Sequence, residues 1–331
     1  MKKNLLALAV GATVAAAPIA ASFADVKVWG RLEVELVSLD GGDFDSKIQQ
    51  GDAGGMSRVG VDASKDLGNG LKAIGRYAWK LDPSNGSQFG ARDQWVGLKG
   101  GWGAFQVGRL PSHYKMYGGV KWDPFTATFM EARRSGGMSG DALGHNGFLN
   151  DVISYASPKF GAVKFALGYI ADETATNADG TGALNGTAVG SISGTFGPVE
   201  VMGSYQNANR DQQSDIKQMK AGIRYKANGL TAAWQYEDVD NSGSVRVNGN
   251  RIAGGQEAKI NFLNLGYKFG NTLIAGNYGK TDAANNGQDV DYFALGARYS
   301  FAKKVHAYLG YAETTTDTKY KMFGAGMRYD F

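Results

Sequence analysis

The stretch KMFGAGMRYDF (321–331) decides the fold class of this chain. Counted back from the last residue, every second position is apolar or aromatic: Phe331, Tyr329, Met327, Ala325 and Phe323. The positions between them are charged, small or, once, Met. Successive side chains of a β-strand point to opposite faces, so the stretch predicts a strand with one apolar and one polar face. The pattern continues to the end of the chain, where most chains fray, so we expect this strand to be held by a neighbour.

The other end of the chain has the pattern of a Sec-type leader. MKKNLLALAVGATVAAAPIAASFA (1–24) begins with two lysines after Met1, continues as an apolar run and ends in small residues. A basic start, an apolar middle and a small-residue cleavage site are typical of secretory signal peptides. A membrane-anchoring helix is the alternative, but Thr13 and Pro18 interrupt the run. The sequence therefore predicts export, with 1–24 removed and 25–331 forming a single domain.

Composition narrows the class of protein further. The chain has 331 residues, no Cys and 49 Gly, and this Gly content is about twice the usual one. Without Cys there is no disulfide framework, zinc knuckle or thiol nucleophile. The formal net charge of +4 falls to +2 when Lys2 and Lys3 leave with the leader, which does not suggest a nucleic-acid-binding protein. No later segment has the ~18 consecutive apolar residues of a helical membrane span.

The mature chain shows the two-residue period of β-strands throughout. VKVWGRLEVELV (26–37) places valines and leucines on one face and charged residues, including Arg31, on the other. LKAIGRYAW (71–79) alternates in the same way, with Lys72 and Arg76 on its polar face. Such alternation indicates half-buried strands. A transmembrane barrel hides the pattern from mean hydropathy, here −0.29, because lipid-facing and lumen-facing residues alternate.

The links between the predicted strands alternate in length. Short turns fall at 66–70, 100–103, 157–161, 195–199, 226–229, 268–271 and 301–304. Longer polar links fall at about 38–56, 82–90, 110–150, 172–186, 208–214, 239–256, 283–288 and 314–318. Seven short and eight longer links join sixteen strands. An even number of antiparallel strands, with short turns on one rim and long loops on the other, is typical of outer-membrane barrels.

Closure of the barrel is a physical requirement in a membrane. Lipid offers no hydrogen-bond partners to backbone N–H and C=O groups, so an open sheet edge is excluded and the last strand must pair with the first. The terminal aromatics of 321–331 then lie at the membrane interface, where aromatic girdles occur. A soluble β-sandwich is the alternative, but it would not explain the regular alternation of link lengths. We predict an all-β protein: a transmembrane antiparallel barrel of sixteen strands.

Several stretches resemble the Gram-negative general porin family. They are VKVWGRLEVEL (26–36), SRVGVDASKDLGNGLKAIGRYAW (57–79), ARDQWVGLKGGWGAFQVGRL (91–110), ISYASPKFGAVKFALGY (153–169) and the terminal Phe331. The resemblance implies a homotrimer in the bacterial outer membrane, in contact with its lipid and lipopolysaccharide, that lets ions and small hydrophilic solutes diffuse passively. It also implies that the barrel assembly machinery recognises Phe331. The third long loop, 110–150, is expected to fold into the lumen and narrow it.

The resemblance also implies a row of arginines on the wall of the constriction. The matching residues are Arg31, Arg58 and Arg92. Alternation independently places Arg31 and Arg58 on the lumen face, and it is ambiguous for Arg92. Lys72 and Arg76 are further candidates for the lumen. A further wall arginine of the family has no match here, because the corresponding position falls near Ala156.

The third loop is expected to supply the opposing charges. Asp123 and Glu131 are the predicted acidic partners of the wall arginines. The loop also carries four basic residues: Lys115, Lys121, Arg133 and Arg134. Charges that line a pore set its ion selectivity, and this balance leans weakly toward anions. Alternatively, Arg133 and Arg134 point to solvent or bind lipopolysaccharide phosphates.

Other functions have less support in the sequence than a diffusion channel. The three His residues, His113, His145 and His306, are far apart and show no metal-ligand spacing, so neither a metal nor a cofactor is expected. An outer-membrane enzyme would need His, Ser and carboxylate side chains together, and no matching motif accompanies His306. A channel specific for phosphate or a sugar is an alternative on the same fold. A closed structural barrel or adhesin is a third.

Overall fold

The computed structural model describes residues 25–42, 44–51, 57–83, 87–140, 147–170, 186–209, 215–247 and 249–331. The predicted leader, 1–24, lies outside the described residues, as do 141–146 of the third loop and most of the link at 172–186. In the described part of the chain, no helix is long and apolar enough to cross a membrane.

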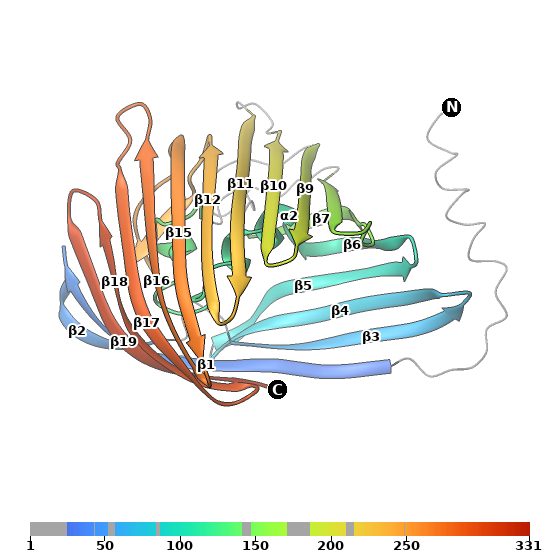
Figure 1. Cartoon of the computed structure of the whole chain (residues 1–331), viewed down its shortest axis with the longest axis horizontal. Coiled ribbons are helices and arrows are strands. Elements are labelled where there is room, and N and C mark those ends of the chain that lie inside the picture. The colour runs from blue at the N-terminus through green and yellow to red at the C-terminus, as the bar shows by residue number, and fades with distance from the viewer. Residues whose placement is uncertain are drawn as a thin grey trace.

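The chain forms a closed antiparallel barrel of sixteen strands, which confirms the predicted fold (Figure 1). One strand of the barrel consists of two segments, β2 and β3, and a separate hairpin, β13–β14, lies outside the barrel sheet. The strands are β1 (Asp25–Gly41), β2 (Phe44–Gly51), β3 (Arg58–Gly68), β4 (Leu71–Asp82), β5 (Ser87–Gly100), β6 (Gly103–Pro111), β7 (Phe148–Ala156), β8 (Val163–Ile170), β9 (Thr187–Phe196), β10 (Val199–Ala208), β11 (Ile216–Ala227), β12 (Leu230–Val239), β13 (Ser244–Val247), β14 (Asn250–Gly254), β15 (Ala258–Phe269), β16 (Thr272–Ala283), β17 (Val290–Ala302), β18 (Val305–Thr315) and β19 (Lys319–Asp330).

The first and last strands close the barrel. β1 pairs with β19 from Arg31 opposite Asp330 to Asp40 opposite Lys321. At the end of this seam, the Gly30 N–H donates to the Phe331 carbonyl at 3.2 Å, and the Phe331 N–H donates to the Gly30 carbonyl at 3.0 Å. The backbone of the last residue is thereby satisfied without water, as the membrane requires. The expected pairing of the last strand with the first is confirmed.

Two of the predicted polar links contain strands. β1 continues past Val37 to Gly41, and β2 pairs with this extension. The prediction of a polar link at 38–56 is therefore wrong over most of that range. Burial explains the difference, because Val37 and Leu39 continue the inward-facing side of β1. The link expected at 239–256 contains the β13–β14 hairpin, in which Val245 and Val247 are buried. Strands of four or five residues contain too few alternating positions for the two-residue period to be recognised in the sequence.

The outward face of the barrel is apolar, as the alternation predicts. On β1, Val26, Val28, Leu32 and Leu36 are exposed, whereas Arg31, Glu33 and Glu35 between them are buried inside. Aromatic pairs occupy the outward face at the short-turn ends of three strands: Tyr267 with Phe269, Tyr299 with Phe301, and Tyr329 with Phe331. An apolar surface bounded by aromatic rings is the form that a bilayer stabilises.

The third loop folds into the barrel, as expected. Its described part, 112–140, contains two short α-helices and a 3-10 turn: α2 (His113–Met116), α3 (Ala132–Ser135) and η1 (Gly119–Lys121). Figure 1 shows α2 inside the ring of strands. Phe125, Phe129 and Met130 pack in one buried cluster with wall residues that include Tyr292 and Tyr308. Hydrophobic burial therefore holds the loop against one side of the lumen.

Two buried wall carboxylates fasten the loop at separate points. Glu35 of β1 accepts from the Phe129 N–H at 3.0 Å. Glu237 of β12 accepts from the Tyr114 hydroxyl at 3.0 Å and from the Ser139 N–H at 3.2 Å. Hydrogen bonds to ionised acceptors are stronger than neutral ones, and here they join segments far apart in the sequence. The loop is therefore a fixed part of the lumen.

Candidate functional site

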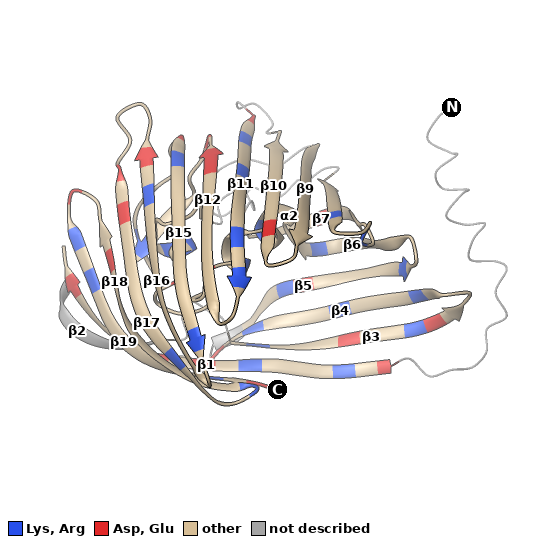
Figure 2. Ribbon diagram, in the orientation of Figure 1, with Lys and Arg blue, Asp and Glu red and all other residues tan. Residues whose placement is uncertain are grey.

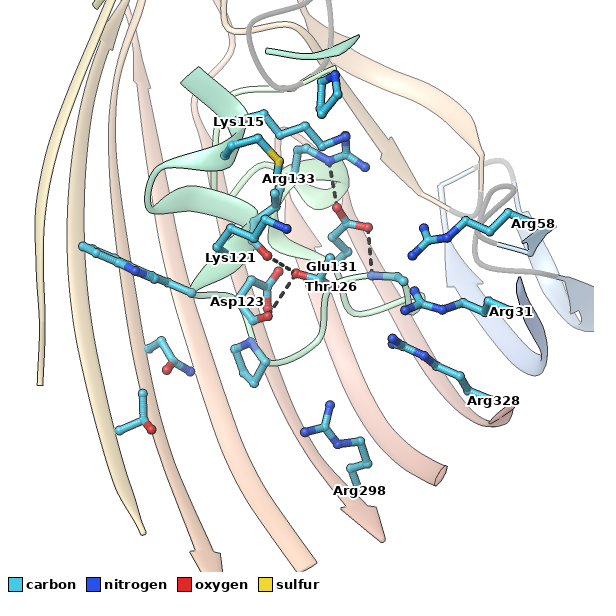
Figure 3. A pocket seen from close by; sticks show the side chains of 18 of the residues that line it. Arg31, Arg58, Lys115, Lys121, Asp123, Thr126, Glu131, Arg133, Arg298 and Arg328 are labelled. Carbon is cyan, nitrogen blue, oxygen red and sulfur yellow. Dashed lines mark hydrogen bonds and ion pairs between the residues drawn. The ribbon is translucent and has the colours of Figure 1, made fainter. Parts of the chain in front are cut away.

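A cavity of about 570 Å³ lies between the third loop and the barrel wall. Figure 3 shows its basic side chains, which come from both the wall and the loop. Among the described residues, its lining includes eleven Lys and Arg but only three Asp and Glu. The basic residues are Arg31, Arg58, Arg76, Arg92, Lys115, Lys121, Arg133, Arg224, Lys226, Arg298 and Arg328, and the acidic ones are Asp93, Asp123 and Glu131.

Three arginines form a row on neighbouring strands. Arg58 of β3 is directly opposite Arg31 of β1, and Arg328 lies on β19, the other neighbour of β1. All three point from the wall toward the loop (Figure 3). Asp330 lies between two of them, with Oδ1 2.7 Å from Arg31 Nε and Oδ2 3.0 Å from Arg328 Nε. Glu33 Oε2 also lies 4.0 Å from Arg31 Nη1, but two carboxylates do not neutralise three guanidinium groups, so the row stays positive.

Arg76 also lines the cavity, but two acids balance its charge. Its Nε and Nη2 donate to Asp62 at 2.7 and 2.8 Å, and its Nη1 lies 3.5 Å from Asp93. A guanidinium group and a carboxylate fit together in this two-bond arrangement, which fixes both side chains. Arg76 therefore adds little net charge to the lumen, although it lines the cavity.

The alternation of faces did not determine whether Arg92 points into the lumen, and the structure places Arg92 in the cavity lining. Its guanidinium lies 5.0 Å from the centre of the Phe148 ring, and Lys115 Nζ lies 4.3 Å from the same ring. Cations near an aromatic face are stabilised by the ring quadrupole, which helps to hold two like charges close together. Lys72 is different, because it is exposed at the short-turn end of β4 and does not line this cavity.

Glu131 is buried, and its carboxylate is turned toward its own loop. Its Oε1 lies 2.7 Å from Arg133 Nε, its Oε2 lies 3.7 Å from Arg134 Nε, and the Ala127 N–H donates to it at 3.1 Å. Burial opposes the charge of Glu131, but the two arginines together hold its pKa below its usual value. Glu131 lines the cavity, yet its charge is shared by two loop arginines rather than directed at the wall.

Asp123 is also buried and braces the loop. Its carboxylate accepts from the backbone N–H groups of Phe125 and Ala132, at 2.8 and 2.9 Å, and from Asn277 Nδ2 at 2.8 Å. Burial, and then the nearby charge of Glu131, raise the pKa of Asp123 to about 7. The two acids predicted to face the wall arginines therefore lie at the cavity, but their oxygens are taken up mainly by partners within the loop.

Four further basic residues line the cavity that were not among the predicted site residues: Arg224, Lys226, Arg298 and Arg328. The two-residue period could have found them. Arg328 lies between the outward-facing Met327 and Tyr329, and Arg298 lies next to the outward-facing Tyr299. Arg224 forms an ion pair with Glu200. These residues belong to β11, β17 and β19, so basic side chains approach the cavity from several sides.

A buried His–Ser pair lies beside the loop. His113 Nε2 and Ser154 Oγ are 2.8 Å apart, and Ser154 is almost completely buried. Burial lowers the pKa of His113 to about 4, although a backbone hydrogen bond with Leu167 opposes the shift, so the ring is neutral at pH 7. The pair joins α2 to the wall. Among the described residues, no group of three His, Cys, Asp or Glu side chains is arranged to hold a metal ion.

Comparison with known proteins gives one consistent answer. The family model described as Gram-negative porin matches residues 5–319. The chain is similar to the major outer membrane protein P.IB of Neisseria meningitidis serogroup B, with 28% identity over 93% of this chain and 91% of that protein.

Solved porin structures share the fold. The anion-selective porin from Comamonas acidovorans has a TM-score of 0.74 at 20% identity, over 93% of this chain and all of that one. OmpF of Salmonella typhi in complex with daunomycin has a TM-score of 0.75 at 16% identity, over 92% and 97%. The trimer form of the outer membrane protein OmpT of Vibrio cholerae has a TM-score of 0.65 at 19% identity, over 94% and 100%.

The family match covers nearly the whole chain, and the barrel, the inward-folded loop and the lined cavity agree with it. A closed barrel with a polar lumen lets solutes cross the membrane without binding tightly to a site in the channel. The chain therefore belongs to the Gram-negative porin family, and it is an outer-membrane channel for passive diffusion of ions and small hydrophilic solutes.

Proposed function

We propose that this porin favours small anions over cations. The single observation that carries the proposal is the excess of eleven basic over three acidic residues in the described lining of the cavity. A narrow passage lined by one sign of charge concentrates ions of the opposite sign, and low-dielectric walls strengthen the effect. The preference proposed here is stronger than the weak lean that the loop charges alone suggest.

The arrangement of the acids supports the same proposal. A basic wall facing an acidic loop would produce a transverse field and little net selectivity. Here Glu131 is ion-paired with Arg133, while Lys115 and Lys121 also line the cavity from the loop side. Both sides of the passage are therefore basic, and a passing cation meets a barrier at each of them.

The test is the reversal potential of single channels in a gradient of potassium chloride. A reversal potential whose sign shows that chloride is more permeant than potassium supports the proposal. A potential of the opposite sign contradicts it. Recordings in increasing concentrations of potassium phosphate address the second candidate, a channel specific for phosphate, which the dense basic lining also favours. Conductance that rises linearly with salt supports general diffusion, whereas conductance that saturates with phosphate supports a specific channel.

We also propose that the functional unit is a homotrimer embedded beside lipopolysaccharide, with no catalytic activity. Small outward-facing residues on β4, Ala73 and Gly75, support close packing of subunits. A solved structural neighbour is described as a trimer form. Chemical cross-linking of the purified protein in detergent tests the oligomer: a ladder that stops at three supports it, and one that stops at one contradicts it. Recognition of Phe331 by the barrel assembly machinery is part of the same proposal.

A further inference from the structure

The β13–β14 hairpin folds onto the third loop at the mouth of the channel. It belongs to the long link between β12 and β15, so it lies on the extracellular side. The Gly140 N–H of the loop donates to the Ser242 carbonyl at 2.7 Å, just before the hairpin. Val247 packs in the same buried cluster as Met138 of the loop. The hairpin is therefore fixed against the loop by both hydrogen bonding and burial.

A second cavity, of about 220 Å³, lies between the hairpin and α3. Its described lining consists of Arg133, Arg134, Ser244 and Arg246, so every charged residue in that lining is basic. Arg133 also lines the larger cavity described above. The two cavities thus share one lining side chain, and the smaller one lies at the hairpin of the long link between β12 and β15.

The described lining of the smaller cavity holds three arginines and no acid. Glu131 forms ion pairs with both Arg133 and Arg134, but it is not part of the described lining of this cavity. Arg246 is the third arginine, and it is exposed on the hairpin. Acidic positions of the neighbouring strands gather at the extracellular ends of β12, β16 and β17 (Figure 2), not in this lining. The described lining of the cavity is therefore positively charged.

The hairpin itself carries an unfavourable pair of like charges. Arg246 of β13 is directly opposite Arg251 of β14, and both side chains are exposed. Like charges at directly opposed positions of two strands destabilise the pairing, and a local conflict of this kind is expected where function requires it. An anion held beside Arg246 would relieve the repulsion.

We propose that this cavity binds small multivalent oxyanions such as phosphate on their way into the channel. Arginine presents several N–H donors in a planar fork that suits oxyanions, and Ser244 adds a hydroxyl. The shared Arg133 would then pass the ion from this extracellular site to the constriction. The inference rests on the proposed anion preference and adds a site to it. Lipopolysaccharide phosphates have the same chemistry, but we assign the site to the free ion because Arg133 lines both this cavity and the larger one in the lumen.

The test is inhibition of single-channel chloride current by inorganic phosphate in a bilayer free of lipopolysaccharide. Phosphate added on the extracellular side is expected to inhibit the wild-type channel at a lower concentration than phosphate added on the periplasmic side. Arg246→Gln should raise the half-inhibiting concentration on the extracellular side about threefold, as expected for loss of one charge near a hydrated ion. Arg246→Lys, which keeps the charge, should lose less of the effect.

Two controls keep the test specific. Lys259→Gln removes one positive charge from an exposed position near the same rim, at the start of β15 and outside the described lining of the cavity, and it should behave as wild type. The orientation of each channel in the bilayer, and so the side to which phosphate is added, is determined by attaching biotin to Thr316→Cys, in the turn before β19, and then adding streptavidin. The label is specific because the chain has no other Cys.

The outcomes separate this inference from the proposed function. Equal inhibition of wild type and Arg246→Gln would overturn the phosphate site even if the reversal potential shows an anion-selective channel. A cation-selective reversal potential would overturn the proposed function itself. If lipopolysaccharide in the extracellular leaflet abolishes the difference between wild type and Arg246→Gln, anchored phosphates occupy the cavity and the free-ion proposal is wrong.

Discussion

The guanidinium groups of Arg58 and Arg76 lie near the same Trp29 ring, 5.8 and 4.8 Å from its centre, but their ion pairs differ. Arg76 is held by Asp62 and Asp93. Within the part of the chain that the structure describes, no carboxylate lies within 4.0 Å of the Arg58 guanidinium. Two arginines on the same side of the lumen therefore contribute very different net charge to the passage.

Arg58→Gln is expected to lower the ratio of anion to cation permeability about twofold, because it removes one positive charge from the wall row. The matched control is the double variant Arg76→Gln/Asp62→Asn, which removes an arginine but leaves the total charge unchanged. Its reversal potential should equal that of wild type. The charge assignment is wrong if the double variant shifts the potential as much as Arg58→Gln does.

Glu131→Gln should shift selectivity further toward anions, also by about twofold. Gln keeps the shape of the side chain and can still accept from the Ala127 N–H, but Arg133 and Arg134 lose their common counter-charge. The control is Glu313→Gln, on the outward side of β18 near the same rim. A reversal potential identical to that of wild type would show that Glu131 does not act on the passing ions.

The anion preference of the wild-type channel should increase as pH falls from about 8.5 to 5.5. Asp123, whose pKa is raised to about 7, gains a proton in this range, and the cavity loses negative charge. The groups that face Asp123 do not cancel the effect, because Glu131 has a lowered pKa and stays charged, while Asn277 does not titrate. Reversal potentials of Asp123→Asn should change less over this range than those of wild type. A pH response in this variant as large as that of wild type would assign the titration to another group.

Glu237→Gln should loosen the third loop. Glu237 accepts hydrogen bonds from Tyr114, Ser139 and Gln235, and each bond to a carboxylate contributes about 1.5–3 kcal/mol. We expect greater open-channel current noise and a lower temperature of barrel unfolding. The control is Tyr236→Phe, the neighbouring residue on the other face of β12, which should leave the noise unchanged. Noise equal to that of wild type in Glu237→Gln would mean that burial alone fixes the loop.

Deletion of Phe331 should reduce the yield of assembled barrel without changing the conductance of the channels that form. The deletion removes two backbone hydrogen bonds to Gly30 at the seam, each contributing about 1 kcal/mol, and Phe331 does not line the cavity. Phe196→Ala, which truncates an exposed aromatic residue at another short turn, is the control. Equal yields for the two variants would argue against a special role of the last residue in assembly.

The amino-acid sequence by itself determined the barrel and the two faces of its strands. The period-two pattern is local, so the outward orientation of Phe323 and Met327 and the inward orientation of Arg31 and Arg58 follow from neighbouring residues alone. The same rule could have placed Arg298 and Arg328 in the lumen. Closure of the barrel followed from the need to satisfy every backbone group in lipid.

Only the tertiary structure determined which partners the charged residues of the third loop contact. The partner of Asp123, Asn277, is 154 positions away in the chain, and Glu131 turns toward Arg133 because the loop is compacted against the wall. The position of Arg246 beside the third loop likewise depends on contacts between the β13–β14 hairpin and a segment distant in the sequence. Loop conformation is set by contacts between segments distant in sequence, which no local period encodes, and these contacts determine how the charges combine at the passage.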